Sequence, residues 1–198
     1  SGATASVTQG SDIDLDGTYT RPPNGTYTHG YAYMDNTFGI TWSGQIASAM
    51  TGSPSGGGGT GVYCVTVANS GTHMVGSTHN NSSKCSANDD LTAGKFVETL
   101  KQFGGSGESF DSRATAENIN GTSAGIVGIL VDTNERRADL STNVKKLEGL
   151  VTFANPVVIT TATTSLNMRF NVGEGMHLNG SSVLQIGGGP FQAIMTAN

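Results

Sequence analysis

Apolar and polar residues alternate along several short stretches of this chain, which is the pattern of strands with one buried face. Between Leu166 and Val172 the alternation is strict, with an apolar residue at every even position. Residues 126–131, by contrast, are apolar or glycine at every position. A period of two indicates a half-buried strand, whereas a short uninterrupted apolar run indicates a central strand that is buried on both faces.

Residues that favour turns separate further stretches of this kind. Residues 62–67 and 72–75 flank Asn69-Ser70-Gly71 and are therefore predicted to form a hairpin. Towards the C-terminus, Asn179-Gly180 and the run Gly187-Gly188-Gly189-Pro190 separate residues 166–172 from two further apolar stretches, residues 183–186 and 191–195. These punctuated runs indicate strands joined by tight turns.

One segment favours a helix instead. Residues 88–90, Asn-Asp-Asp, offer N-cap candidates and negative charge for a helix N-terminus, and Gly104-Gly105 would end the helix. Between them, four apolar side chains fall on one helical face: Phe96, Val97, Leu100 and Phe103. The pattern predicts an amphipathic helix at about residues 90–103 that packs on a sheet.

The predicted fold class is mostly β, an antiparallel sandwich or barrel-like sheet with one packed α-helix (about residues 90–103). A chain of 198 residues is long enough for one domain with a core of its own. We expect a single β-rich domain over residues 1–198. The alternative is a sub-boundary near residues 86–120, where the charged residues begin to gather.

Charge is scarce and unevenly placed. Charged residues make up 13% of the chain, about half the usual quarter, and residues 36–83 contain no Asp, Glu, Lys or Arg. The net charge is −5, and basic residues cluster only as the pairs Arg136-Arg137 and Lys145-Lys146. The sequence therefore offers no electrostatic basis for nucleic-acid binding. No apolar run approaches about 18 residues, so no membrane span is predicted.

The two cysteines, Cys64 and Cys85, flank part of this uncharged region. We predict that they form one disulfide, which places the chain in an oxidising setting: extracellular, on a cell surface or in a virion. Two free thiols in a reducing compartment are the alternative. A zinc site with His73 and His79 has suitable residue types, but their spacing fits no usual zinc arrangement.

An acidic stretch near the N-terminus matches the opening of a calcium loop. Asp12, Asp14 and Asp16 alternate and are followed by Gly17, which is the D-x-D-x-D-G pattern. Position twelve, however, is Pro23, where such a loop needs a bidentate Glu. The alternative is an edge strand with an acidic outer face. Apart from this calcium hypothesis, no cofactor is predicted.

Gly121-Thr122-Ser123-Ala124-Gly125 matches the G-x-S-x-G pattern of a nucleophile elbow. Asp132 or Asp139, and then His177, follow in the chain order of a hydrolase triad. The motif needs a buried strand before the serine and a helix after it. Here polar residues precede it and a β-branched run follows, so we interpret the match as chance.

Aromatic residues concentrate early in the chain, and Tyr31, Tyr33 and Trp42 are candidates for a glycan-binding face. Exposed aromatic rings among Asn and Thr side chains offer stacking surfaces beside hydrogen-bonding groups. The alternative is that these rings form the core of the first sheet, which the alternation of Tyr31 and Tyr33 also fits.

These observations rank three functions. The first is a non-enzymatic extracellular structural subunit that self-assembles through β-strand surfaces, as a surface filament, an adhesive layer or a virion component. In that hypothesis strand edges are completed by neighbours, and the extended segment Thr4–Thr8 is a candidate donor strand. The second is a monomeric adhesion module that binds a glycan or a cell surface. A secreted hydrolase is third, because no catalytic constellation with the required context is found.

Overall fold

The chain folds into strands joined by loops. The computed structural model describes residues 5–8, 14, 18, 20–73, 81–103, 109–115, 124–171, 175–188 and 192–198. Within these residues the helical elements are two short 3-10 helices, Pro54–Gly56 and Ser141–Asn143. The mostly β prediction is thus confirmed, while the sandwich or barrel-like arrangement and the single domain stay predictions.

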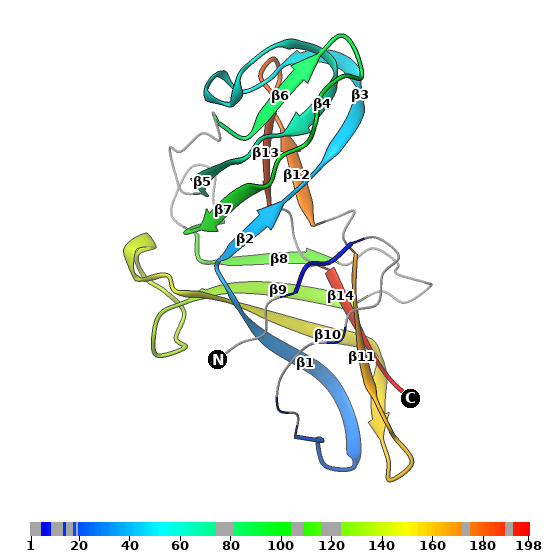
Figure 1. Ribbon diagram of the computed structural model, residues 1–198. Helices are drawn as coiled ribbons and strands as arrows, with labels where there is room; N and C mark the ends of the chain where they lie inside the picture. The colour runs from blue at the N-terminus through cyan, green and yellow to red at the C-terminus, as the bar shows by residue number, and fades with distance from the viewer. Residues whose placement is uncertain are drawn as a thin grey trace.

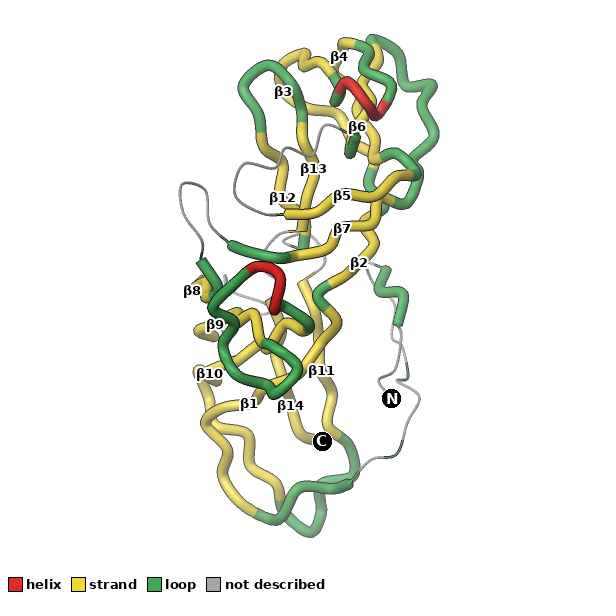
Figure 2. Tube along the Cα trace, turned by 90° about the vertical axis from the view of Figure 1, so that its left-hand side faces the viewer, coloured by secondary structure: helices red, strands yellow, loops and turns green. Residues whose placement is uncertain are grey.

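The strands form two groups, one above the other in Figure 1 and again in the turned view of Figure 2. The lower group contains a four-stranded antiparallel sheet in the order β1-β10-β9-β8, with a pair, β11-β14, packed against β10 and β9. Their bounds are Gly25–Asp35 (β1), Lys146–Ile159 (β10), Ala124–Val131 (β9), Asp111–Thr115 (β8), Leu166–Asn171 (β11) and Gln192–Ala197 (β14).

The upper group holds three smaller sheets, β3-β4-β6, β2-β7-β5 and β12-β13. All their pairings are antiparallel except the parallel pair β5-β7. The bounds are Thr37–Ile40 (β2), Ser43–Thr51 (β3), Thr60–Thr66 (β4), Asn69–His73 (β5), Ser83–Ser86 (β6), Phe96–Leu100 (β7), Met176–Asn179 (β12) and Gln185–Gly188 (β13). The uncharged segment 36–83 supplies β2 to β5, so neutral residues build most of this group.

Two hydrophobic cores lie in these groups, and one side chain belongs to both. The lower core contains Leu100, Phe110, Leu130, Ala138, Val144 and Leu147. The upper core contains Ile40, Cys64, Cys85, Leu184 and Ile186. Phe38, on β2, packs against both cores.

The helix predicted at about residues 90–103 is wrong. Residues 96–100 form β7, between β2 and β5, and burial alternates along it: Phe96, Glu98 and Leu100 are buried while Val97 and Thr99 are half-buried. Phe96 and Leu100 fit both a helical and a strand period, so the two models differ at positions 97 and 98. The strand buries Glu98, whose Oε2 accepts a hydrogen bond from the backbone N–H of Gly188 on β13.

The predicted hairpin of residues 62–67 with 72–75 is also wrong where it is described, and residues 74 and 75 lie outside the described residues. Residues 62–66 belong to β4, which pairs with β3 and β6, whereas residues 69–73 form β5 and pair in parallel with β7. By contrast, the strand predicted at 126–131 is confirmed as part of β9, which lies between β10 and β8; Leu130 and Val131 are buried, whereas residues 127–129 are half-buried, so the expected burial is found at the end of the run.

The predicted disulfide is confirmed. Cys64 on β4 lies directly opposite Cys85 on β6, with 4.1 Å between their Cα atoms, and both side chains are buried in the upper core. The bond closes a loop with a sequence separation of 21 residues. Its effect is therefore to restrict the unfolded chain while occupying a core position in the folded one.

We expect the double variant Cys64→Ala/Cys85→Ala to lose about 3 kcal/mol of unfolding free energy, because the unfolded chain regains the entropy of an open loop. Chemical denaturation of oxidised wild type and the variant measures the difference. A reducing agent should destabilise wild type by a similar amount and leave the variant unchanged. Equal stabilities of oxidised wild type and variant would contradict the expectation.

A second stability test concerns the contact of β4 with β6. A Cβ added at Gly61 would lie 1.8 Å from the backbone oxygen of Ser86, so Gly61→Ala should cost about 2–3 kcal/mol by forcing the two strands apart. Gly149→Ala is the control, because its Cβ would meet only the Met34 Cε at 3.5 Å. Similar unfolding midpoints for the two variants would show that the strands do not approach this closely.

Candidate functional site

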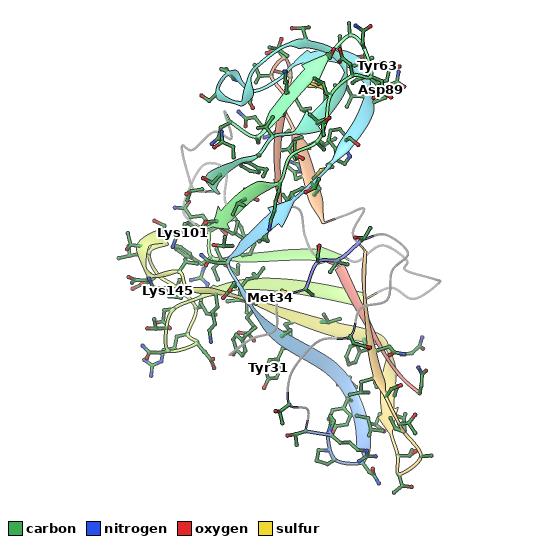
Figure 3. All side chains as sticks on the ribbon, in the orientation of Figure 1. Tyr31, Met34, Tyr63, Asp89, Lys101 and Lys145 are labelled. Atoms are coloured by element: carbon green, nitrogen blue, oxygen red, sulfur yellow. A yellow bond between two sulfur atoms is a disulfide. The ribbon has the colours of Figure 1, made fainter. Side chains whose placement is uncertain are left out.

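The outer face of β1 carries a pair of exposed tyrosines. Tyr31 is 67% exposed and Tyr33 is 38% exposed. Their ring centroids lie 5.8 Å apart with an interplanar angle of 77°, an edge-to-face contact. Met34, the next residue, packs against the lower core, so the two faces of β1 divide between core and solvent. Figure 3 labels Tyr31 and Met34 along this strand.

Ionisable groups border the tyrosine pair on the side of β10. Tyr33 lies opposite Glu148, and Asp35 lies opposite Lys146. The Lys146 Nζ is 5.6 Å from the centroid of the Tyr33 ring and 3.1 Å from Glu135 Oε1. The surface therefore combines two aromatic rings with a cation that is shared between a ring and a carboxylate.

These surroundings further disfavour ionisation of the Tyr33 phenol. Partial desolvation raises the pKa of Tyr33 above its ordinary value, and the nearby carboxylates of Glu148 and Glu135 raise it further. Both causes disfavour the phenolate, because it would add negative charge beside existing negative charge. The hydroxyl thus remains a hydrogen-bond donor as well as an acceptor at neutral pH.

β1 is also the terminal strand of its sheet. Its one partner among the described strands is β10, and it is 11 residues long, about twice the average strand. From Gly25 to Met34 it contains no Asp, Glu, Lys, Arg or Pro. The opposite terminal strand, β8, has five residues, and its sequence includes Asp111 and Arg113. Charged side chains are one way in which proteins protect strand edges, so the sequences of the two terminal strands differ in this respect.

The structure separates the three predicted glycan-binding residues. Trp42 is half-buried and packs against the upper core, and its backbone N–H donates to the Thr66 Oγ1 at 2.9 Å. Tyr31 and Tyr33 belong to the lower sheet and face solvent. The core interpretation therefore describes Trp42, and the exposed-face interpretation describes the tyrosine pair.

The predicted calcium residues fall mostly outside the described part of the chain. Asp12 and Asp16 lie outside the described residues, and Asp14 is exposed. Among the residues that the model describes, no group of three or more His, Cys, Asp or Glu side chains gathers in a way that could hold a metal ion. Since Cys64 and Cys85 are bonded to each other, they are not zinc ligands.

The residues of the hydrolase hypothesis serve other purposes where they are described. Asp132 Oδ1 accepts backbone hydrogen bonds from Asn134 and Arg136, at 2.7 and 3.1 Å, in the loop between β9 and β10. The backbone bond from Arg136 is the first cause of its lowered pKa, so Asp132 is an ionised turn-stabilising group. Asp139 accepts from Asn143 in the same loop, His177 is on β12 in the upper group, and Ser123 lies outside the described residues.

A cavity lies on the other group of sheets, where the sequence predicted no site. Its volume is about 320 Å³, and its floor is formed by the paired ends of β3 and β4. The lining includes Ser43 and Gln45 from β3, Tyr63 from β4, and Asp89 and Leu91 from the segment after β6. No local motif marks these residues, because they meet only through the pairing of β3 with β4 and the return of the chain after β6.

Comparison of the chain with protein family models, with curated protein sequences and with solved structures gives no match. The described residues contain no helix of the length and hydropathy needed to cross a bilayer. The buried disulfide is compatible with an extracellular setting.

We predict that Glu148→Gln lowers the pKa of Tyr33, since it removes the nearest charge that opposes phenolate formation. A pH titration followed by NMR of the tyrosine ring carbons measures the shift. Asp139→Asn is the control, because this exposed carboxylate does not contribute to the raised pKa of Tyr33. An unchanged Tyr33 titration in Glu148→Gln would contradict the electrostatic account of the site.

Proposed function

We propose that this chain is a non-enzymatic extracellular structural subunit that associates with copies of itself through the open edge of β1. The observation that carries the proposal is the long terminal strand of the lower sheet, which is uncharged from Gly25 to Met34. Among the described residues no second strand pairs with this edge, so its backbone N–H and C=O groups can accept a strand from another copy, which would extend the sheet.

Three further features support association over an isolated role. Copies that meet along Gly25–Met34 would bring few like charges together, because this stretch contains no Asp, Glu, Lys or Arg. The exposed rings of Tyr31 and Tyr33 provide apolar area beside the edge, which a neighbour would bury. The disulfide suits a subunit that works in an oxidising environment.

The segment Ala5–Thr8 is compatible with the donor-strand hypothesis. Its residues are exposed, they belong to no strand, and Val7 is 46% exposed. Thr4 lies outside the described residues. An extended apolar-polar segment of this kind is one candidate for the strand that a neighbour contributes, and β1 of a second copy is the other.

The second candidate function is a monomeric module that binds a glycan or a cell surface, and a specific observation favours it. Tyr31 and Tyr33 present aromatic surface to solvent beside Lys146 and Glu148, which combines stacking with polar contacts. Trp42 takes no part in this version, because it packs in the upper core.

The test is to protect the edge. Tyr31→Lys places a charge beside β1, as natural edge strands do, and should weaken self-association about tenfold because paired copies would bring like charges together. Sedimentation velocity at rising protein concentration measures the association constant. Leu140→Lys is the matched control, since Leu140 is 52% exposed and lies outside the sheets, and it should change the constant less than about twofold.

Two outcomes would count against the proposal. A wild-type protein that remains monomeric at the highest concentration reached would remove it and leave the adhesion module as the better hypothesis. Equal weakening by Tyr31→Lys and Leu140→Lys would show that association does not use β1.

A further inference from the structure

The cavity between β3, β4 and the segment after β6 has the composition of a ligand site. Ser43, Gln45 and Tyr63 come from strand positions that share one face of the sheet, since Gln45 lies directly opposite Tyr63 and Ser43 opposite Val65. Asp89 and Leu91 complete the lining from the chain that leaves β6. Figure 3 shows Tyr63 and Asp89 close together at the upper end of the molecule.

The opposite face of the same strands packs in the upper core. Cys64 alternates with Tyr63 and Val65 along β4, and its side chain belongs to the upper core together with Trp42. A Cβ added at Gly44, between Ser43 and Gln45, would lie 2.6 Å from the Trp42 ring, so Trp42 packs on the backbone of β3 from the core side. The Trp42 ring and the disulfide thus pack on the side of β3 and β4 that faces away from the cavity.

The lining offers three kinds of hydrogen-bonding group beside apolar surface. Ser43 and Gln45 can each donate and accept, and the carboxylate of Asp89 accepts only. All three side chains are exposed, so the cavity opens to solvent. Tyr63 and Leu91 are half-buried and supply an aromatic ring and an aliphatic side chain. A volume of about 320 Å³ lies at the small end of the range for small-molecule sites.

We propose that this cavity binds a neutral saccharide of one or two rings. Sugar hydroxyls can donate to the Asp89 carboxylate and exchange hydrogen bonds with Gln45 and Ser43, while the C–H face of a sugar ring packs on Tyr63. Asp89 is the one charged residue in the lining and residues 36–83 add no other charge, so an anionic ligand is disfavoured and a cation would be held by a single exposed carboxylate. The site is on β3 and β4, so it does not depend on association through β1.

Ligand-observed saturation-transfer NMR tests the proposal, with the methyl glycosides of glucose, galactose and N-acetylglucosamine as probes. We expect saturation transfer to at least one probe with an affinity in the millimolar range. Asp89→Ala should weaken that affinity about tenfold, the loss of one charge-assisted hydrogen bond. Asp90→Ala is the matched control: it removes an exposed neighbouring carboxylate that does not line the cavity, and the affinity should stay within about twofold.

Tyr63 provides a second, independent variant. Tyr63→Phe keeps a stacking ring and should retain binding, whereas Tyr63→Leu should lose it. Because the ligand is uncharged, its affinity should not fall when salt is raised, whereas that of a cation held by Asp89 would fall.

Three results would overturn the proposal. The first is the absence of saturation transfer to every probe. The second is binding that Asp89→Ala and Tyr63→Leu both leave unchanged, since the sugar would then occupy another place. The third is an affinity that falls steeply with salt. Asp89 is exposed, so its replacement leaves the fold intact and the test does not depend on the Tyr63 variants.

Discussion

The junction of β1 with β2 holds the two groups of sheets together. Asn36 lies between these strands, and it is buried. Its side-chain Nδ2 donates to the backbone oxygen of Leu100 at 2.8 Å. In return the backbone N–H of Leu100 donates to the backbone oxygen of Asn36 at 2.7 Å. Two residues later, Phe38 packs into both cores. Buried hydrogen bonds of this kind are costly to break, because each leaves a polar group without water. The exposed face of β1 and the cavity on β3 and β4 are therefore presented by one connected framework.

Local periodicity predicts a strand correctly where the residues of that strand alone carry the pattern. It fails where a strand that is distant in sequence determines the pairing. The apolar run at 126–131 indicates a central strand without any knowledge of which strands pair with it. Residues 72–75, by contrast, followed a good turn signal, yet residues 69–73 pair with β7 some 25 residues further on. The helix expected near residues 90–103 failed for a related reason. A helix would place Glu98 on the face opposite Phe96 and Leu100, but β13 brings the N–H of Gly188 to the Glu98 carboxylate, and this hydrogen bond offsets part of the cost of burying it. No sequence pattern near residue 98 indicates that the hydrogen-bond donor to this carboxylate lies at residue 188.

The candidate sites divide in the same way. The disulfide could be predicted because two cysteines in an uncharged setting leave few alternatives, and the exposed aromatic character of Tyr31 and Tyr33 could be suspected from composition. Trp42 is close to Tyr31 and Tyr33 in sequence but not in the fold. Between Tyr33 and Trp42 the strand β2 leads the chain from the lower core to the upper core. The lining of the cavity could not be predicted at all. Gln45, Tyr63 and Asp89 are ordinary residues, and only the pairing of β3 with β4 gives them a shared surface.

The two edges of the lower sheet make an internal comparison that bears on assembly. Both belong to one protein in one solvent, yet β8 is short and its sequence carries Asp111 and Arg113, while β1 is long and uncharged as far as Met34. The low charge of the whole chain does not explain this difference, because β8, in the same sheet, does contain charged residues. Association through β1 alone would give closed pairs of copies. Open growth needs a second, different edge. β3 ends its sheet and contains no charged residue or proline from Ser43 to Thr51, and only Thr51 at its end bonds to the chain at residues 182–184 among the described residues, so residues 43–50 offer such an edge in the upper group. A subunit with an uncharged terminal stretch of strand in each group has two different edges through which a filament or layer would grow, which is why the structural hypothesis ranks above the monomeric one.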